Sequence, residues 1–244
     1  MLEVADSLIQ ADKLNCLAGI VILAGGASKR MGTPKAELIL PTGERLLDYH
    51  IRQALELSAA MISNIPIMIA DNGRGFSINS NLIKNSQSPI SYIADYLSNN
   101  DKPIETGGAL VAIESALQSL TSRKNATGAS QIPDDHQSWL LVISCDSLIP
   151  INDLWQKLQP YMTQNTDKSV ICLTDDHHLY PLLGLYHVSI EPDLKDYIDG
   201  GQRQVMRFIK PMVQPVPFAK EWQCLTNFNT PKDFEHACLA LNDL

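Results

Sequence analysis

Short apolar runs alternate along this chain with longer stretches of helical periodicity. Two runs, Leu17–Leu23 and Trp139–Ser144, are almost continuously apolar, which is typical of parallel strands buried on both faces. Residues 46–58 instead carry apolar side chains at positions 46, 47, 51, 54 and 55, which is the period of a helix with one buried face. The pattern therefore predicts an alternation of strands and helices.

The rest of the chain follows the same two patterns. We expect further strands at 65–70, 91–94, 169–173, 182–186 and 213–216, and helices at 109–120, 151–158, 190–198 and 204–209. A closing helix should run to residue 241, because Thr230 suits its N-cap, Pro231 its first position and Asp233 its first turn. The polar segment 123–137 is expected to form an exposed loop.

This alternation predicts an α/β protein, a three-layer α/β/α sandwich around a Rossmann-like, mainly parallel sheet. The length suits one domain over residues 17–244, with residues 1–16 as an N-terminal extension. Sheets of this kind bind ligands at the carboxyl ends of their strands. Functional residues should therefore follow directly after the predicted strands.

Charge and composition narrow the possible partners. A formal net charge of −8 argues against binding to nucleic acid, and the longest apolar stretch, residues 17–24, is too short to span a membrane. The first residues lack the basic start and apolar centre of a secretory signal. The five cysteines form no C-x-x-C pair, so we expect reduced thiols in a cytoplasmic protein.

A loop rich in glycine follows the first predicted strand. Residues 23–35 read LAGGASKRMGTPK, and the glycines let a backbone approach a phosphate chain closely. Arg30 and Lys35 add the positive charge that offsets phosphate oxygens. Neither G-x-x-x-x-G-K-[ST] nor G-x-G-x-x-G occurs here, which argues against P-loop NTPases and dinucleotide oxidoreductases. The segment is predicted to bind phosphate; the alternative is a tight turn with solvated charges.

Two acidic residues follow later strands. Asp146 comes after the apolar run 139–144, where a carboxylate can ligate Mg²⁺ together with substrate phosphates. The same side chain could instead cap the helix that starts near Ile151. Asp95 follows the weak strand at 91–94 and is either a ligand-binding residue or an ordinary turn acid.

The loop sequence LAGGxSxRMG at residues 23–32, followed by Lys35 and by Cys-Asp at 145–146, resembles nucleotidyltransferases of the molybdenum cofactor guanylyltransferase type. The segments 201–208 and 225–234 are similar to two later motifs of that family, so the resemblance runs from about residue 17 to residue 241. It implies the nucleotide-diphospho-sugar transferase type of sandwich. The implied reaction is transfer of GMP from GTP to molybdopterin or the molybdenum cofactor, with release of pyrophosphate.

The resemblance also implies a role for each matching residue. Arg30, Lys35 and Asp146 would be catalytic, and Asp146 would hold the Mg²⁺ cofactor. GTP would be bound by Leu23, Ala24, Gly25, Gly26, Lys35, Asp95, Gly108 and Asp146. The pterin acceptor would be bound by Arg203, Asn227 and Asn229. Implied protein partners are transient ones, namely molybdenum cofactor biosynthesis proteins or molybdoenzyme chaperones.

Some alternatives stay open at this point. Residues 108–112 match the family's base-selecting loop only at Gly108 and Leu110, so a cytidylyltransferase for the same pterin is the nearest rival. A sugar-1-phosphate nucleotidyltransferase and a nucleotide-binding regulator without catalysis are further alternatives. Arg203 could be a solvated charge, and the two asparagines could bond to local backbone before the closing helix.

Overall fold

The computed structural model describes residues 16–26, 28–61, 64–84, 86–97, 108–127, 138–164 and 167–242. Over these residues one seven-stranded sheet has the order β3-β2-β1-β4-β6-β5-β7. The strands are β1 (Leu17–Leu23), β2 (Ile67–Ala70), β3 (Ile90–Tyr92), β4 (Trp139–Ser144), β5 (Val170–Thr174), β6 (Leu179–His187) and β7 (Val213–Pro217). All neighbours pair in parallel except β6, which runs antiparallel to both β4 and β5.

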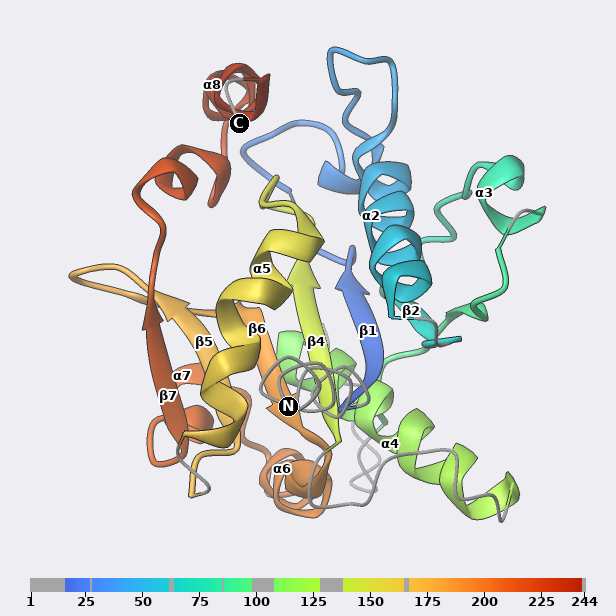
Figure 1. Ribbon diagram of the computed structural model, residues 1–244, viewed down its shortest axis with the longest axis vertical. Coiled ribbons are helices and arrows are strands. Elements are labelled where there is room, and N and C mark those ends of the chain that lie inside the picture. The colour runs from blue at the N-terminus through green and yellow to red at the C-terminus, as the bar shows by residue number, and fades with distance from the viewer. Residues whose placement is uncertain are drawn as a thin grey trace, which may run out of the picture.

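Helices cover both faces of the sheet, as Figure 1 shows. The α-helices are α2 (Leu46–Ala60), α3 (Ser80–Lys84), α4 (Ala109–Thr127), α5 (Ile151–Leu158), α6 (Glu191–Asp199), α7 (Val205–Ile209) and α8 (Pro231–Asn242). Short 3₁₀ helices are η1 (Lys35–Glu37), η3 (Gln159–Thr163), η4 (Val188–Ile190) and η5 (Lys220–Leu225). The predicted three-layer α/β/α sandwich with a mainly parallel sheet is confirmed.

The core has one layer on each side of the sheet. Ile20 and Ile22 of β1 pack in the layer that contains α2, α5 and α8, whereas Val21 packs in the layer with α4, α6 and α7. All three side chains are fully buried. Successive side chains of a strand point to opposite faces, so a strand covered on both faces must be apolar throughout. This explains the continuous apolar runs in the sequence.

Most predicted elements are confirmed, with ends that differ by a few residues. The expected loop from residue 123 is wrong for its first part, because α4 continues to Thr127. The expected strand at 182–186 is longer, Leu179–His187, and antiparallel. Residues 1–15 and 128–137 lie outside the described residues, so the predicted extension stays a prediction there. Cys16, assigned to it, is buried, and its carbonyl accepts the Trp139 N–H at 2.8 Å.

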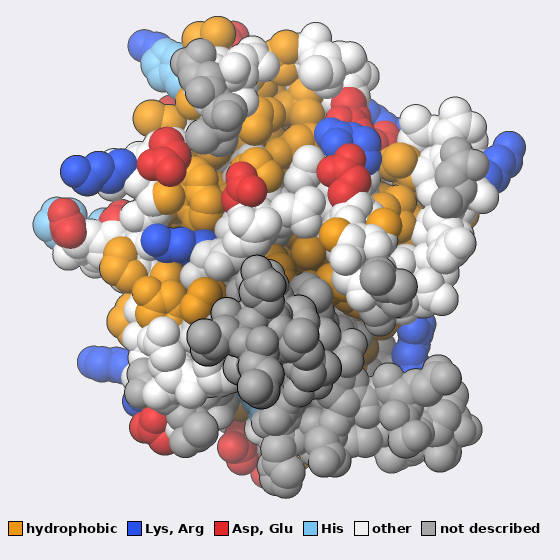
Figure 2. Space-filling model, in the orientation of Figure 1, with side chains coloured by type: hydrophobic (Ala, Val, Ile, Leu, Met, Phe, Trp, Pro, Cys, Tyr) orange, Lys and Arg blue, Asp and Glu red, His pale blue; other side chains and the backbone are white. Residues whose placement is uncertain are grey.

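Charges on the outer side of α2 are balanced. Arg52 forms ion pairs with Glu44 and Glu56, both at 2.9 Å, and Figure 2 shows blue and red side chains together over this helix. On the part of this face that the structure describes, basic side chains are scattered and form no continuous patch. No helix in the described ranges is long and apolar enough to cross a membrane.

A buried carboxyl lies where α4 packs against α6. Glu114 is fully buried and faces Glu191, Lys195 and Asp199 of α6. Burial, reinforced by the neighbouring Glu191 carboxylate, raises the pKa of Glu114 to about 8. The folded protein therefore holds a proton here that the unfolded chain, with an ordinary pKa near 4.5, releases at lower pH.

This proton makes the stability of the fold depend on pH. Through Glu114, the folded state holds a proton between about pH 5 and 8 that the unfolded chain has released, so this group makes the free energy of unfolding fall as pH rises. Burial lowers the pKa of His50 from 6.5 to about 4, so His50 acts in the opposite direction below pH 6.5 and the effect of Glu114 is clearest above it. Glu114→Gln should flatten that slope and raise stability at pH 8, while Glu235→Gln on exposed α8 should leave it unchanged. Urea unfolding at several pH values measures this. An identical slope in wild type and Glu114→Gln would contradict it.

Candidate nucleotide site

A cavity of about 640 Å³ opens at the carboxyl ends of β1, β2 and β4. It contains every residue that the sequence predicted for nucleotide binding and catalysis: Leu23, Ala24, Gly25, Gly26, Arg30, Lys35, Asp95, Gly108 and Asp146. Asn229, predicted for the acceptor, lines the same cavity. The structure therefore brings these predicted residues together at one edge of the sheet, and their function stays a prediction.

The loop after β1 lies against the loop after β2. The Ala24 N–H donates to the Ala70 carbonyl at 2.9 Å, which continues the strand pairing by one residue. At Gly25 a Cβ atom would lie 2.8 Å from the Cβ of Asn72, closer than real Cβ atoms approach other heavy atoms. Gly25 is therefore required by the close approach of the two loops, which shapes this wall of the cavity.

Lys35 is aimed at the cavity by the local fold of its own loop. The Lys35 backbone N–H donates to the Ser28 hydroxyl at 3.1 Å, and this bond ties the end of the glycine loop to η1. Ser28 has φ 45, a left-handed conformation that folds the chain back on itself. Arg30, on the exposed part of the same loop, also lines the cavity, so both cations serve one cavity.

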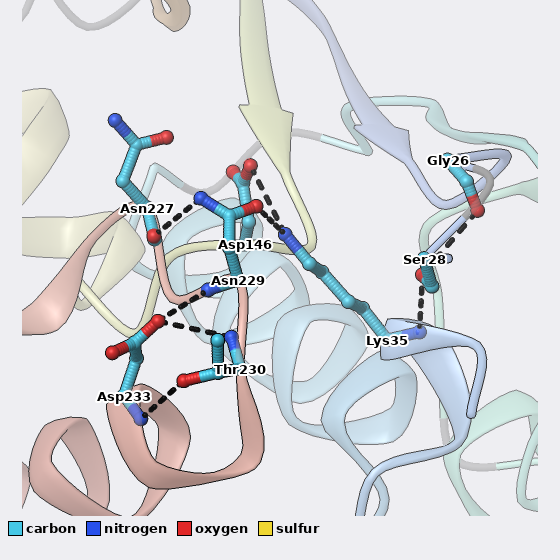
Figure 3. A network of polar contacts seen from close by, with 8 residues as sticks. All are labelled: Gly26, Ser28, Lys35, Asp146, Asn227, Asn229, Thr230 and Asp233. Atoms are coloured by element: carbon cyan, nitrogen blue, oxygen red, sulfur yellow. Dashed lines mark hydrogen bonds and ion pairs between the residues drawn. The ribbon is translucent and has the colours of Figure 1, made fainter. Parts of the chain in front are cut away.

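Three polar side chains that line the cavity, those of Lys35, Asp146 and Asn229, meet one another in Figure 3. The Lys35 Nζ lies 3.5 Å from the Asp146 Oδ2 and donates to the Asn229 Oδ1 at 3.2 Å. It also lies 5.6 Å from the centre of the Phe228 ring. The side chains of Lys35 and Asp146 are 15% and 30% exposed, so both remain accessible to a ligand. A cation and a carboxylate that share a cavity are suited to a metal-bound phosphate chain.

The segment before α8 holds Asn229 in this position. The Asp233 carboxylate accepts the backbone N–H groups of Asn229 and Thr230 at 3.0 and 2.9 Å. The Thr230 hydroxyl accepts the Asp233 N–H at 3.2 Å in return. These backbone N–H groups, that of Asn229 foremost, lower the pKa of Asp233. The predicted start of the closing helix is confirmed, and the same cap fixes a residue of the site.

Asp146 does not serve as a helix cap. The N-cap of α5 is Pro150, and no side chain makes a capping hydrogen bond there. The alternative interpretation of Asp146 is therefore wrong, and its carboxylate is directed to Lys35 instead. Asp95 is half-buried in the cavity wall, and this burial, together with the Asp71 carboxylate, raises its pKa.

The loop after β2 adds two residues that the sequence analysis missed. Asn72 and Arg74 line the cavity, and buried Asp71 shapes their loop by accepting the N–H groups of Gly73 and Gly75 at 3.0 and 2.7 Å. Asn72, Gly73 and Gly75 all have positive φ. The signal was the sequence Asp-Asn-Gly-Arg-Gly directly after a predicted strand.

Two predicted acceptor residues do not reach the cavity. The Arg203 guanidinium donates from Nη1 to the carbonyls of Ile198 and Gln202, both at 2.6 Å, and so closes the end of α6. Asn227 is exposed with φ 58 and lies in no strand; its carbonyl accepts the Asn229 side-chain amide at 2.8 Å. Figure 3 shows its side chain turned away from Lys35. Their role toward an acceptor stays a prediction.

The donor set fits a magnesium ion that arrives with a nucleotide. Mg²⁺ prefers oxygen ligands and is commonly held by one or two carboxylates plus substrate phosphates. Asp146 is one accessible carboxylate, and it lines the same cavity as the cations Arg30 and Lys35 of the glycine loop. Among the described residues no group of three or more His, Cys, Asp or Glu could hold a metal ion. The site thus suits a metal shared with substrate, not one bound by protein ligands alone.

Comparison with known proteins identifies the family of this chain. Residues 20–215 match the model of the MobA-like NTP transferase domain, so the chain belongs to this family. It is 27% identical over 221 residues to a probable molybdenum cofactor guanylyltransferase of Synechococcus elongatus, covering 88% of this chain and 95% of the relative. It is 26% identical over 220 residues to the molybdenum cofactor guanylyltransferase of Yersinia pestis, covering 87% and 91%.

Solved structures share the fold. The molybdopterin-guanine dinucleotide biosynthesis protein A of Archaeoglobus fulgidus superimposes with a TM-score of 0.61 at 18% identity, covering 93% of this chain and all of the other. A 4-diphosphocytidyl-2C-methyl-D-erythritol synthase of Anaerococcus prevotii gives 0.54 at 11% identity, covering 93% and 99%. The sandwich is thus of the type that the sequence resemblance implied.

The close approach at Gly25 gives a direct test of the loop. Gly25→Ala should push the loops after β1 and β2 apart and so lower the melting temperature. GTP binding should weaken by about 10-fold, because the displaced loops no longer form a cavity wall that fits the nucleotide. Calorimetric titration and thermal melting measure both effects. Gly26→Ala, where a Cβ would have no atom within 4 Å, should melt like wild type. A Gly25→Ala protein that melts and binds GTP like wild type would show that the approach is unimportant.

Proposed function

We propose that this protein transfers GMP from GTP to the terminal phosphate of molybdopterin or its molybdenum form, in a magnesium-dependent reaction that releases pyrophosphate. One observation carries the proposal: Lys35 and Asp146, which are 111 positions apart, meet at 3.5 Å in the cavity that also contains the glycine loop. Family membership and the names of the relatives support the choice of acceptor and nucleotide.

The bond changes in this reaction are those of a substitution at phosphorus. An oxygen of the acceptor phosphate bonds to the α-phosphorus of GTP, while the bond from that phosphorus to the oxygen bridging to the β-phosphorus breaks. Pyrophosphate leaves with the electron pair. The acceptor is already anionic, so no strong general base is needed. The protein therefore contributes by positioning the reactants and neutralising charge.

The residues of the cavity supply this charge. Arg30 and Lys35 offset the negative charge of the triphosphate, and the glycine loop lets backbone N–H groups approach it. Asp146 holds the Mg²⁺, which neutralises phosphate charge and polarises the reacting group when it is bound. The Lys35 ammonium reduces the electrostatic repulsion between the Asp146 carboxylate and the anionic triphosphate, which share this cavity.

The nucleobase is proposed to bind near Asp95 and Gly108, which line the same cavity. A carboxylate can accept two adjacent N–H donors, which guanine offers on its N1 and exocyclic N2 and cytosine does not. This supports guanine as the base.

The biological setting is part of the proposal. We place the reaction in the cytoplasm, with transient contacts to molybdenum cofactor biosynthesis proteins or molybdoenzyme chaperones that supply the acceptor and take up the product. The free thiols of Cys145, Cys172, Cys224 and Cys238 agree with a reducing compartment.

Removing the proposed metal ligand tests the mechanism. Asp146→Asn keeps the side-chain size but loses the charge, so turnover should fall by about 100- to 1,000-fold. Pyrophosphate release with molybdopterin as acceptor measures turnover, and circular dichroism checks the fold. Asp153→Asn, on the exposed side of α5, should remain active. Full turnover in Asp146→Asn would remove the metal role.

Nucleotide preference tests the assignment of the base. With Mg²⁺ present, GTP should raise the melting temperature more than CTP or ATP, because a ligand stabilises the folded state according to its affinity. A larger shift with CTP would make the protein a cytidylyltransferase. Binding of GTP without pyrophosphate release in the presence of acceptor would favour a regulator over an enzyme.

A further inference from the structure

The loop between β4 and α5, which carries Asp146, is held from two sides. From α2, the Tyr49 hydroxyl donates to the Leu148 carbonyl at 3.1 Å. From the other side, the Leu148 N–H donates to the Leu225 carbonyl at 2.7 Å. Both backbone groups of Leu148, two residues beyond Asp146, are therefore occupied by partners outside the loop.

Ser147, which lies between Asp146 and Leu148, is also held by contacts with neighbouring residues. It forms an isolated antiparallel bridge with Thr226, and its hydroxyl accepts the Ile149 N–H at 3.2 Å. The fully buried ring of His50 lies beside the Ser147 backbone, although neither ring nitrogen makes a hydrogen bond of normal geometry. The turn after Asp146 thus packs closely against α2 on one side and the segment after η5 on the other.

Tyr49 is itself held firmly. Its side chain is almost fully buried, at 4% exposure. Its ring contacts the His50 ring edge-on at 5.4 Å between centres, and the Arg52 guanidinium lies over it at 5.4 Å. A hydroxyl on such a side chain keeps one position, so it can fix the carbonyl that it bonds. This packing makes Tyr49 a fixed support for the turn instead of an incidental surface contact.

We propose that Tyr49 is a positioning residue for Asp146: its hydrogen bond to Leu148 holds the turn in the position from which the Asp146 carboxylate reaches a metal-bound nucleotide. This inference rests on the proposed role of Asp146. Partners that orient a metal-holding group commonly affect metal affinity by about 10- to 100-fold. Because Tyr49 acts through a backbone carbonyl, we expect an effect at the lower end of that range.

The test removes only the hydroxyl. Tyr49→Phe keeps the ring and its contacts, so the turn loses one hydrogen bond without a cavity. Binding of Mn²⁺, a stand-in for Mg²⁺ whose free form is measured by its paramagnetic resonance signal, is titrated with GTP present and acceptor absent. The same titration of GTP without protein is subtracted, because GTP alone also binds Mn²⁺, so that only the affinity added by the protein is compared between variants. Tyr49→Phe should weaken Mn²⁺ binding by about 10-fold. Affinity for GTP without metal should remain at the wild-type value, and the Mg²⁺ concentration for half-maximal turnover should rise by the same factor.

A second tyrosine provides the matched control. Tyr186 is fully buried and its hydroxyl donates to the Pro181 carbonyl at 2.9 Å. It packs in the core layer on the opposite face of the sheet from Tyr49 and Leu148. Tyr186→Phe should bind Mn²⁺ like wild type. Equal weakening in both variants would show a general loss of stability and would overturn the positioning role.

Asp146→Asn separates this inference from the function on which it rests. If Asp146→Asn loses Mn²⁺ binding while Tyr49→Phe matches wild type, the positioning role is wrong and the proposed function stands. If Asp146→Asn binds Mn²⁺ as tightly as wild type, Asp146 does not hold the metal, and both proposals fail. Loss in Asp146→Asn with a selective weakening in Tyr49→Phe supports both.

Discussion

The contact of the Lys35 ammonium with the Asp146 carboxylate joins two loops that are distant in the sequence. Asn229 adds a third segment through its side-chain oxygen. A partly exposed ion pair contributes little to stability, about 1 kcal/mol or less. The pair is therefore too weak to hold the two loops together. The surrounding strands and turns must bring the two charges to this distance. The importance of the pair lies in its charges: the Lys35 ammonium reduces the repulsion that an anionic ligand in this cavity would meet from the Asp146 carboxylate.

The sheet places two of these charges. β1 and β4 are adjacent parallel strands with Leu23 opposite Ser144, so their loops leave the sheet at the same edge and level. The third segment is placed differently. The turn after Asp146 bonds to residues 225–226, and a few residues later the cap of α8 fixes Asn229. A short stretch of backbone pairing thus connects the C-terminal helix to the turn that follows Asp146.

Some of this arrangement can be predicted from sequence. A buried strand followed by glycines and cations is a local signal, and the position of Asp146 after another apolar run places it at the same edge. Apolar runs do not carry direction, however, so the antiparallel course of β6 could not be predicted. Helical periodicity also ends before α4 does, because its last turns are polar.

Long-range contacts limited the prediction of the site. The sequence shows Arg203 as a charge near a family motif, but only the fold shows that its guanidinium closes α6. Tyr49 has the helical spacing of a core residue, and its bond to Leu148 depends on how α2 packs against the turn. Arg74 enters the cavity because Asp71 folds its loop. Each of these contacts joins a side chain to a backbone N–H or carbonyl group. The position of such a group follows from the folded backbone and cannot be read from the order of residue types.

A crystal structure of the protein with GTP and Mg²⁺ would test directly whether Lys35 and Asp146 act on one nucleotide. We expect a triphosphate between the glycine loop and Asp146, with the Lys35 ammonium on phosphate oxygens and the metal bound to both carboxylate and phosphate. A nucleotide bound elsewhere, with Lys35 and Asp146 contacting only each other, would contradict it.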